Sequence, residues 1–221
     1  MKYKALIFDM DGTIINSEHI WKKATRDLIE SKGVVLSDED HDKLNERLKG
    51  LAIRASCSII KEETAMEHAL EDLMREKKQR AFDLYKNGIF FIEGFEDFHK
   101  QVLEHNLKTG IATSADDLTL QAAISHLKLD QFFGEHIYGI SQVNEVYKPA
   151  PDIYLHTAAK LGIDPKECIA IEDSHYGVQA AVNAGMFCIG INTSKNRDNL
   201  KDAHLIVETY EEICLKSLLK R

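Results

Sequence analysis

The chain has 221 residues, of which 44% are hydrophobic and 29% are charged. At roughly 150 residues per domain, we expect either one domain with an insertion or a large domain with a small one. A chain with this apolar content can bury a core, which excludes an intrinsically disordered protein. Its 28 basic and 36 acidic side chains give a net charge of −8. This is the opposite of the basic surplus typical of nucleic-acid-binding proteins.

The cysteines and the apolar segments favour a cytoplasmic protein. The N-terminal apolar run ends after Phe8 and is too short for a signal peptide. The uncharged segment 174–194 contains amides and glycines, which argues against a membrane span. We therefore expect neither a membrane nor a nucleic acid as partner, and we expect a monomer. The four cysteines form no C-x-x-C pair, so buried thiols are expected at Cys57, Cys168, Cys188 and Cys214.

The first expected strand, Tyr3–Phe8, is followed by a helical segment over about residues 17–87. Apolar residues recur in this segment at helical spacing, and it contains no convincing strand. Ser37 is expected to cap one helix because Asp40 follows three residues later. Trp21 is expected in the core of the segment, and a position facing the substrate is the alternative.

Strands and helices alternate in the rest of the chain. The expected strands are Thr109–Thr113, Ile137–Ser141, Cys168–Glu172, Phe187–Ile191 and Leu205–Val207. The expected helices are Phe95–His105, Leu118–Leu127, Asp152–Leu161 and Gly177–Ala184. Several strands are apolar at successive positions, which is typical of strands buried on both faces. The pattern predicts an α/β fold with a parallel sheet between two helical layers.

Two carboxylates follow the first strand, in the sequence Asp9-Met10-Asp11-Gly12-Thr13. Residues i and i+2 of an extended chain point to the same side. Asp9 and Asp11 should therefore face one space beyond the carboxyl end of the strand, where open α/β sheets bind ligands. Close carboxylates repel each other unless a cation or proton lies between them, and Mg²⁺ prefers oxygen ligands. Taken alone, these residues are equally well interpreted as a loop with capping aspartates.

Polar residues of complementary kinds occupy three further positions, each after an expected strand or at the start of an expected helix. Thr113 and Ser114 offer hydroxyl and backbone N–H groups that bind an anion where a helix begins. Lys148 precedes a proline-rich helix entry that holds its backbone in place. Glu172 and Asp173 form a second acidic pair. Together these residues indicate a site for a metal ion and an anion such as phosphate.

With these motifs in order, the sequence resembles the haloacid dehalogenase (HAD) superfamily, in particular its phosphatase and β-phosphoglucomutase-like branch. The motifs are Asp9-Met10-Asp11-Gly12-Thr13, Thr113-Ser114, Lys148-Pro149-Ala150-Pro151-Asp152 and Glu172-Asp173-Ser174. The resemblance implies a Rossmann-like three-layer α/β core over residues 1–15 and 90–221. It also implies an inserted all-α helical cap domain over residues 16–89, and a small phosphorylated metabolite as the partner.

The resemblance also implies catalytic roles. Asp9 would be the nucleophile that becomes an aspartyl phosphate, and Asp11 would protonate the leaving oxygen and later activate water. Thr113 would bind a phosphoryl oxygen with the backbone of Ser114 nearby, and Lys148 would neutralise negative charge.

The same resemblance implies a Mg²⁺ cofactor. Its ligands would be Asp9, Glu172, Asp173 and the backbone carbonyl of Asp11.

Substrate-binding residues are expected in the cap, where Leu48-Lys49-Gly50 and Arg54 resemble the loop that reaches the substrate in the mutase branch. Lys49 and Arg54 would then bind a distal phosphate or sugar hydroxyls. Alternatively, they are solvated cations at helix ends.

We expect hydrolysis of a small phosphate monoester, such as a sugar phosphate or phosphoglycolate. The mutase branch carries a cap histidine where this chain has Trp21, which favours hydrolysis over β-phosphoglucomutase activity. A non-catalytic regulatory protein on the same scaffold is the further alternative.

Overall fold

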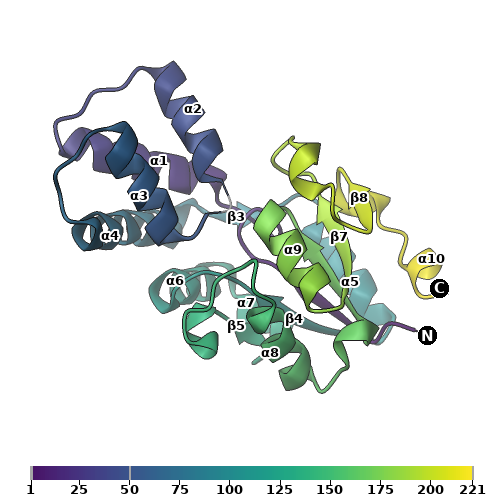
Figure 1. The fold of residues 1–221 in the computed structure, drawn as a ribbon. Helices are drawn as coiled ribbons and strands as arrows, with labels where there is room; N and C mark the ends of the chain where they lie inside the picture. The colour runs from purple at the N-terminus through teal and green to yellow at the C-terminus, as the bar shows by residue number, and fades with distance from the viewer. Residues whose placement is uncertain (1, 50, 221) are drawn as a thin grey trace.

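A parallel sheet forms the centre of the molecule in this computed structural model, which describes residues 2–49 and 51–220 (Figure 1). Within these residues its six strands lie in the order β5-β4-β1-β6-β7-β8, and all neighbours are parallel. The strands are β1 (Ala5–Phe8), β4 (Lys108–Ala112), β5 (Ile137–Tyr138), β6 (Cys168–Glu172), β7 (Phe187–Ile191) and β8 (Leu205–Val207). The predicted parallel α/β fold is confirmed.

Helices cover both faces of the sheet, because β1 carries apolar side chains on both sides. Leu6 and Phe8 belong to one hydrophobic cluster, which includes residues of α5, α6, α7 and α10. Ala5 and Ile7 belong to another, which includes residues of α8 and α9. These helices are α5 (Phe95–Glu104), α6 (Asp117–Leu127), α7 (Leu129–Phe133), α8 (Asp152–Leu161), α9 (His175–Asn183) and α10 (Leu215–Leu218).

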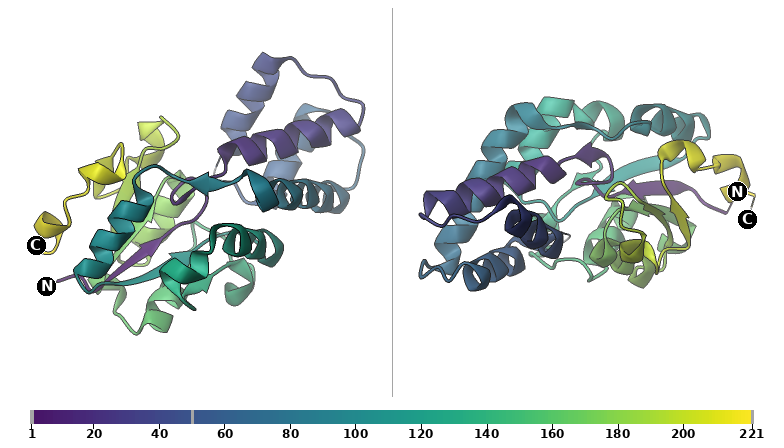
Figure 2. Two further views of the ribbon diagram at one scale, coloured as in Figure 1. Left: turned by 180° about the vertical axis from the view of Figure 1, so that it is seen from behind. Right: turned by 90° about the horizontal axis from the view of Figure 1, so that it is seen from above.

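Within the described residues, four of the five helices between β1 and β4, all except α5, extend to one side of the sheet, beyond the carboxyl ends of the strands (Figures 1 and 2). They are α1 (Glu18–Ser31), α2 (Asp38–Leu48), α3 (Ile53–Glu63) and α4 (Leu70–Gly88). The predicted cap of α2 is confirmed, because the Ser37 hydroxyl accepts a hydrogen bond of 3.1 Å from the Asp40 N–H. Their outer parts form a separate hydrophobic cluster that includes Leu28, Leu48 and Leu73.

Two short strands join these helices to the sheet. β2 (Ile15–Asn16) and β3 (Phe90–Phe91) pair in antiparallel fashion, with Ile15 opposite Phe91. The two ends of the helical segment are therefore held side by side. These strands were not predicted, because two residues are too few to show a strand period.

Two other details differ from expectation. The predicted strand Ile137–Ser141 ends at Tyr138, because the Gln142 side chain accepts a 2.7 Å hydrogen bond from the Gly139 N–H and starts a 3₁₀ turn. Cys214 is exposed because it lies in the loop before α10, whereas the other three cysteines are buried as predicted. In the described part of the chain, no helix has the length and apolar character needed to cross a bilayer.

Candidate active site

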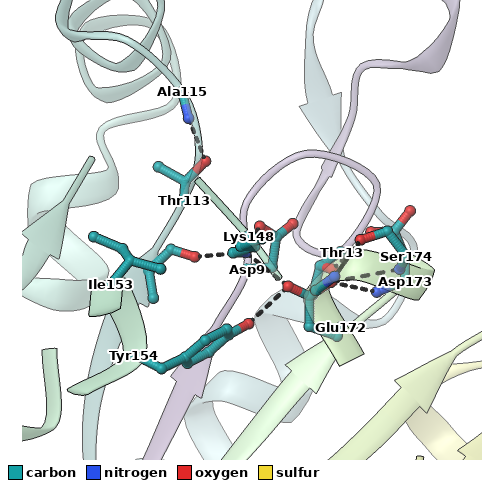
Figure 3. Close-up of polar contacts among 12 residues, drawn as sticks. Asp9, Thr13, Thr113, Ala115, Lys148, Ile153, Tyr154, Glu172, Asp173 and Ser174 are labelled. Carbon is teal, nitrogen blue, oxygen red and sulfur yellow. Dashed lines mark hydrogen bonds and ion pairs between the residues drawn. The ribbon is translucent and has the colours of Figure 1, made fainter. Parts of the chain in front are cut away.

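The carboxyl ends of the neighbouring strands β4, β1 and β6 bring the predicted motifs together (Figure 3). Asp9 directly follows β1, Thr113 follows β4, and Glu172 is the last residue of β6. In the strand order, β4 and β5 lie on one side of β1, whereas β6, β7 and β8 lie on the other. The strand order therefore reverses beside β1, and α/β proteins bind ligands at such switch points. Lys148 reaches the same place from the loop before α8.

The ammonium group of Lys148 lies between two carboxylates. Its Nζ atom is 2.5 Å from Asp9 Oδ1 and 2.7 Å from Glu172 Oε1, and it donates a third hydrogen bond of 3.0 Å to the Ala112 carbonyl. Burial alone would lower the pKa of Lys148, but the charges of Asp9 and Glu172 outweigh it and raise that pKa. The lysine is therefore a fixed positive charge beside the first carboxylate.

Glu172 is fully buried, and both of its oxygens are occupied by donors within the chain. Oε1 accepts hydrogen bonds from Lys148 and, at 2.8 Å, from the Tyr154 hydroxyl. Oε2 accepts from the Asp173 N–H at 3.2 Å and from the Ser174 hydroxyl at 3.2 Å. These contacts make Glu172 the group that positions Lys148 and the turn after β6.

Two glycines allow the close packing of these acids. A Cβ atom on Gly177, in the first turn of α9, would lie 2.0 Å from the Glu172 carboxylate. A Cβ atom on Gly12 would lie 2.2 Å from Asp173 Oδ2, and Gly12 also has a φ of +81°. Both positions therefore require glycine for steric reasons, and Gly12 requires it for its backbone conformation as well.

Repulsion and burial disfavour negative charge in this cluster. Burial raises the pKa of Asp9 from 3.8 to about 7, against the lowering effect of Lys148. Burial, followed by repulsion from Asp9 and Glu172, raises the pKa of Asp173 well above its usual range. A cation between these groups would relieve the repulsion.

The residues present fit the predicted Mg²⁺. Oxygen atoms of Asp9, Glu172 and Asp173 lie within 4.8 Å of one another, and such hard oxygen donors suit this ion. Because the Glu172 oxygens already accept five hydrogen bonds, we infer that Asp9 and Asp173 offer the more available ligand atoms. The carboxylate of Asp11 lies outside this group, and its backbone carbonyl as a ligand stays a prediction.

Asp11 and Asp9 line the same cavity, but Asp11 has a hydrogen-bond partner other than Lys148. Its Oδ1 atom accepts a hydrogen bond from the hydroxyl of Tyr85 on α4. Burial raises the pKa of Asp11, although hydrogen bonds from Ser17, Tyr85 and Trp21 counteract this effect. A carboxyl group that holds a proton more readily than usual is suited to acid and base chemistry.

The Thr113-Ser114 turn is the predicted anion-binding side of the site. Thr113 is buried, and its hydroxyl accepts a 3.1 Å hydrogen bond from the Ala115 N–H. Asp116 then caps α6 by accepting a 3.1 Å hydrogen bond from the Thr119 N–H. Thr113 and Ser114 both line the cavity, just before the N-terminus of α6.

The cavity has a volume of about 510 Å³ and lies between the sheet edge and the helices α1 to α4. This volume is typical of sites for small metabolites. The half-buried ring of Trp21 packs on Tyr85 and against the hydrophobic core, as expected, and it also lines this cavity.

The predicted substrate-binding residues of the helical segment differ in their position relative to the cavity. Lys49 lines the cavity, but its Nζ atom is 2.7 Å from a Glu46 carboxylate oxygen and 3.4 Å from one of Glu18. Arg54 is exposed, pairs with Glu71 at 3.5 Å, and is absent from the cavity lining. Gly50 lies outside the described residues. Substrate binding by these residues stays a prediction.

Comparison with known proteins identifies the family. A family model described as "Haloacid dehalogenase-like hydrolase" matches residues 6–202. The chain belongs to this HAD family. The result confirms the family predicted from the four motifs.

Relatives in the HAD family match most of this chain. "Phosphorylated carbohydrates phosphatase" of Thermotoga maritima is 29% identical, over 83% of this chain and 82% of its own length. "Protein SUPPRESSOR OF QUENCHING 1, chloroplastic" of Arabidopsis thaliana is 31% identical over 91% of this chain, which spans only 19% of that protein. A crystal structure of β-phosphoglucomutase from Clostridium difficile has a TM-score of 0.80 and 27% identity, covering 99% of this chain and 96% of that one. At the level of the enzyme family, the prediction of a HAD-type phosphoric monoester hydrolase is confirmed.

One cavity residue of this HAD chain was not identified from the sequence. Lys77 on α4 is 3% exposed, and its Nζ atom donates a 2.6 Å hydrogen bond to the Ser56 hydroxyl. No carboxylate of residues 2–49 or 51–220 pairs with it, and burial lowers the pKa of Lys77 to about 8. A lysine within the apolar spacing of a helix was the available signal, but charged residues usually occupy exposed helix faces.

Proposed function

We propose that the protein is a phosphatase that hydrolyses a small phosphate monoester through an aspartyl phosphate on Asp9. The main support is the position of the Lys148 ammonium group. It donates a 2.5 Å hydrogen bond to Asp9, is held in place by Glu172, and lines the same cavity as the Thr113-Ser114 turn. This arrangement supports the proposal because it brings a carboxylate, a fixed cation and hydroxyl and N–H groups to one sheet edge. Phosphoryl transfer needs mainly such positioning and neutralisation of charge.

In the first step, an Asp9 carboxylate oxygen attacks phosphorus, and the bond from phosphorus to the ester oxygen breaks. Protonated Asp11 gives its proton to that oxygen, which leaves as an alcohol. Lys148 neutralises charge on Asp9 and on the transferred group, while Thr113 and Ser114 hold the phosphoryl oxygens.

In the second step, the Asp11 carboxylate takes a proton from water as the water oxygen attacks phosphorus. The bond between phosphorus and the Asp9 oxygen breaks, which releases inorganic phosphate and restores both aspartates to their starting states. Asp9 and Asp173, with Glu172 behind them, would hold Mg²⁺, which when bound supplies neutralisation of phosphoryl oxygens.

We also propose that residues 16–89 act as a cap over a core of residues 1–15 and 90–221, and that the cap selects the substrate. Lys77 is buried, and no described residue provides a counter-ion for it, which is energetically unfavourable. A substrate with a second acceptor group would relieve this, so we expect a carboxylate or sugar hydroxyls opposite Lys77. The sugar-phosphate class suggested by the Thermotoga maritima relative meets this requirement.

Release of inorganic phosphate from p-nitrophenyl phosphate and from a panel of sugar phosphates tests this proposal. We expect turnover with Mg²⁺, little turnover with a chelator, and none for Asp9→Asn. Asp11→Asn should also lose turnover with alkyl esters. Equal turnover by wild type and Asp9→Asn would refute the mechanism.

β-Phosphoglucomutase activity remains the second candidate, because the fold matches that of a mutase over the whole chain. Incubation of β-glucose 1-phosphate with a bisphosphate activator distinguishes the two. Interconversion to glucose 6-phosphate without release of phosphate would favour the mutase. An absence of both products across the panel would favour the regulatory protein.

A further inference from the structure

The carboxylate of Asp11 is held by the helical segment rather than by the sheet that positions Asp9. One of its donors is the hydroxyl of Tyr85 on α4, which bonds to Asp11 Oδ1, and the other two, Ser17 and Trp21, lie at the start of α1. The Tyr85 side chain is fully buried. The ring of Trp21 on α1 packs edge-on against it, with centroids 6.2 Å apart and an interplanar angle of 68°. Because the Tyr85 ring is enclosed, its hydroxyl group has a fixed orientation, and the hydrogen bond from this hydroxyl orients the Asp11 carboxylate.

We propose that Tyr85 is a positioning residue that orients Asp11 for proton transfer to the leaving group. This inference rests on the proposed phosphatase function. Because the tyrosine O–H donates to Oδ1, that oxygen is an acceptor, and the transferable proton of protonated Asp11 lies on Oδ2. As Asp9 bonds to phosphorus and the ester bond breaks, this proton moves from Oδ2 to the departing oxygen.

The same hydrogen bond makes proton transfer depend on where α4 lies. Tyr85 belongs to α4, whereas Asp11 belongs to the loop after β1. A second link joins α4 to the core, because Lys78 Nζ is 3.5 Å from a carboxylate oxygen of Asp116 at the start of α6. If α4 moves away from the core, Tyr85 leaves with it. Asp11 is then oriented for catalysis only while the helices cover the cavity.

Leaving-group dependence tests this role. The p-nitrophenolate group is a weak base and departs without a proton, whereas an alkoxide needs one. Misplacement of a catalytic group by about 1 Å costs up to about 100-fold. For Tyr85→Phe we therefore expect kcat/KM to fall about 10- to 100-fold for alkyl phosphates, and less than about threefold for p-nitrophenyl phosphate.

Tyr210→Phe is the matched control, because this buried tyrosine donates a 2.9 Å hydrogen bond to the Thr13 carbonyl in the neighbouring loop. We expect it to change kcat/KM for both esters by the same factor. On the small residual turnover of alkyl esters in an Asp11→Asn background, Tyr85→Phe should have no further effect, because its partner has lost the transferable proton.

Two outcomes would overturn the inference while leaving the phosphatase proposal intact. One is an equal fall for both esters in Tyr85→Phe, which would indicate a purely structural role. The other is an undiminished effect of Tyr85→Phe in the Asp11→Asn background. Failure of the wild-type protein to hydrolyse either ester would instead refute the phosphatase proposal and this inference with it.

Discussion

Replacement of Gly177 by alanine tests how tightly the acidic cluster is packed. On helix propensity alone, alanine within α9 should stabilise the protein by about 1 kcal/mol. The structure predicts the opposite sign, because the new Cβ atom would lie 2.0 Å from three atoms of the Glu172 carboxylate. That group cannot move without breaking its bonds to Lys148 and Tyr154.

The magnitude follows from those lost contacts. A hydrogen bond to a charged group contributes about 1.5 to 3 kcal/mol. Displacing Glu172 loses two such bonds, at Lys148 and Tyr154. After the gain in helix propensity, we expect Gly177→Ala to lower the free energy of unfolding by about 2 to 5 kcal/mol. Misplacement of Lys148 should also lower kcat/KM by about 100-fold.

Urea unfolding curves and p-nitrophenyl phosphate kinetics measure these effects. A Glu172→Ala background provides the control, because without the carboxylate Gly177→Ala should raise stability by about 1 kcal/mol relative to that background. The reasoning is refuted if Gly177→Ala in the otherwise wild-type chain is more stable than wild type and retains full turnover.

Two further predictions concern the substrate and the metal. Lys77→Met should raise KM for the preferred ester by about 10-fold or more and leave KM for p-nitrophenyl phosphate nearly unchanged. Equal changes in KM for the two esters in steady-state assays would contradict the proposed role of this lysine. Without a divalent cation, stability should fall as pH rises from about 4 to about 7, because the native protein binds a proton on Asp9 more tightly than the unfolded chain does. The difference between the ordinary pKa of 3.8 and the pKa of about 7 for Asp9 in the folded protein corresponds to a loss of at most about 4 kcal/mol in the free energy of unfolding. Mg²⁺ should therefore raise the urea midpoint more at pH 8 than at pH 5, and a shift independent of pH would count against the metal site.

The strands and motifs of the core could be predicted because their signals are local. The apolar run of β6 and the acids at its end lie within a few residues of each other, and parallel strands share one carboxyl edge. The same reasoning predicts that Asp9, Thr113 and Lys148 lie near one another, as they do in the structure.

The cap side could not be predicted in this way, because its contacts depend on how separate helices cross. Lys77 and Tyr85 appear as ordinary members of a helical pattern, and only the position of α4 against the core brings them to the cavity. Lys49 and Arg54 are predicted from a resemblance to a cap loop, and that resemblance does not indicate the acids that pair with them in the structure.

The helices α1 and α4 each belong to two hydrophobic cores. Their inner residues, including Ala24 and Ala81, join the cluster beneath the sheet edge, while Leu28 and Leu73 join the outer cluster with α2 and α3. We therefore expect the outer half to be exchangeable. We expect that residues 32–69 can be grafted from another chain to alter the chosen substrate, while the sheet edge and its proton donor remain unchanged.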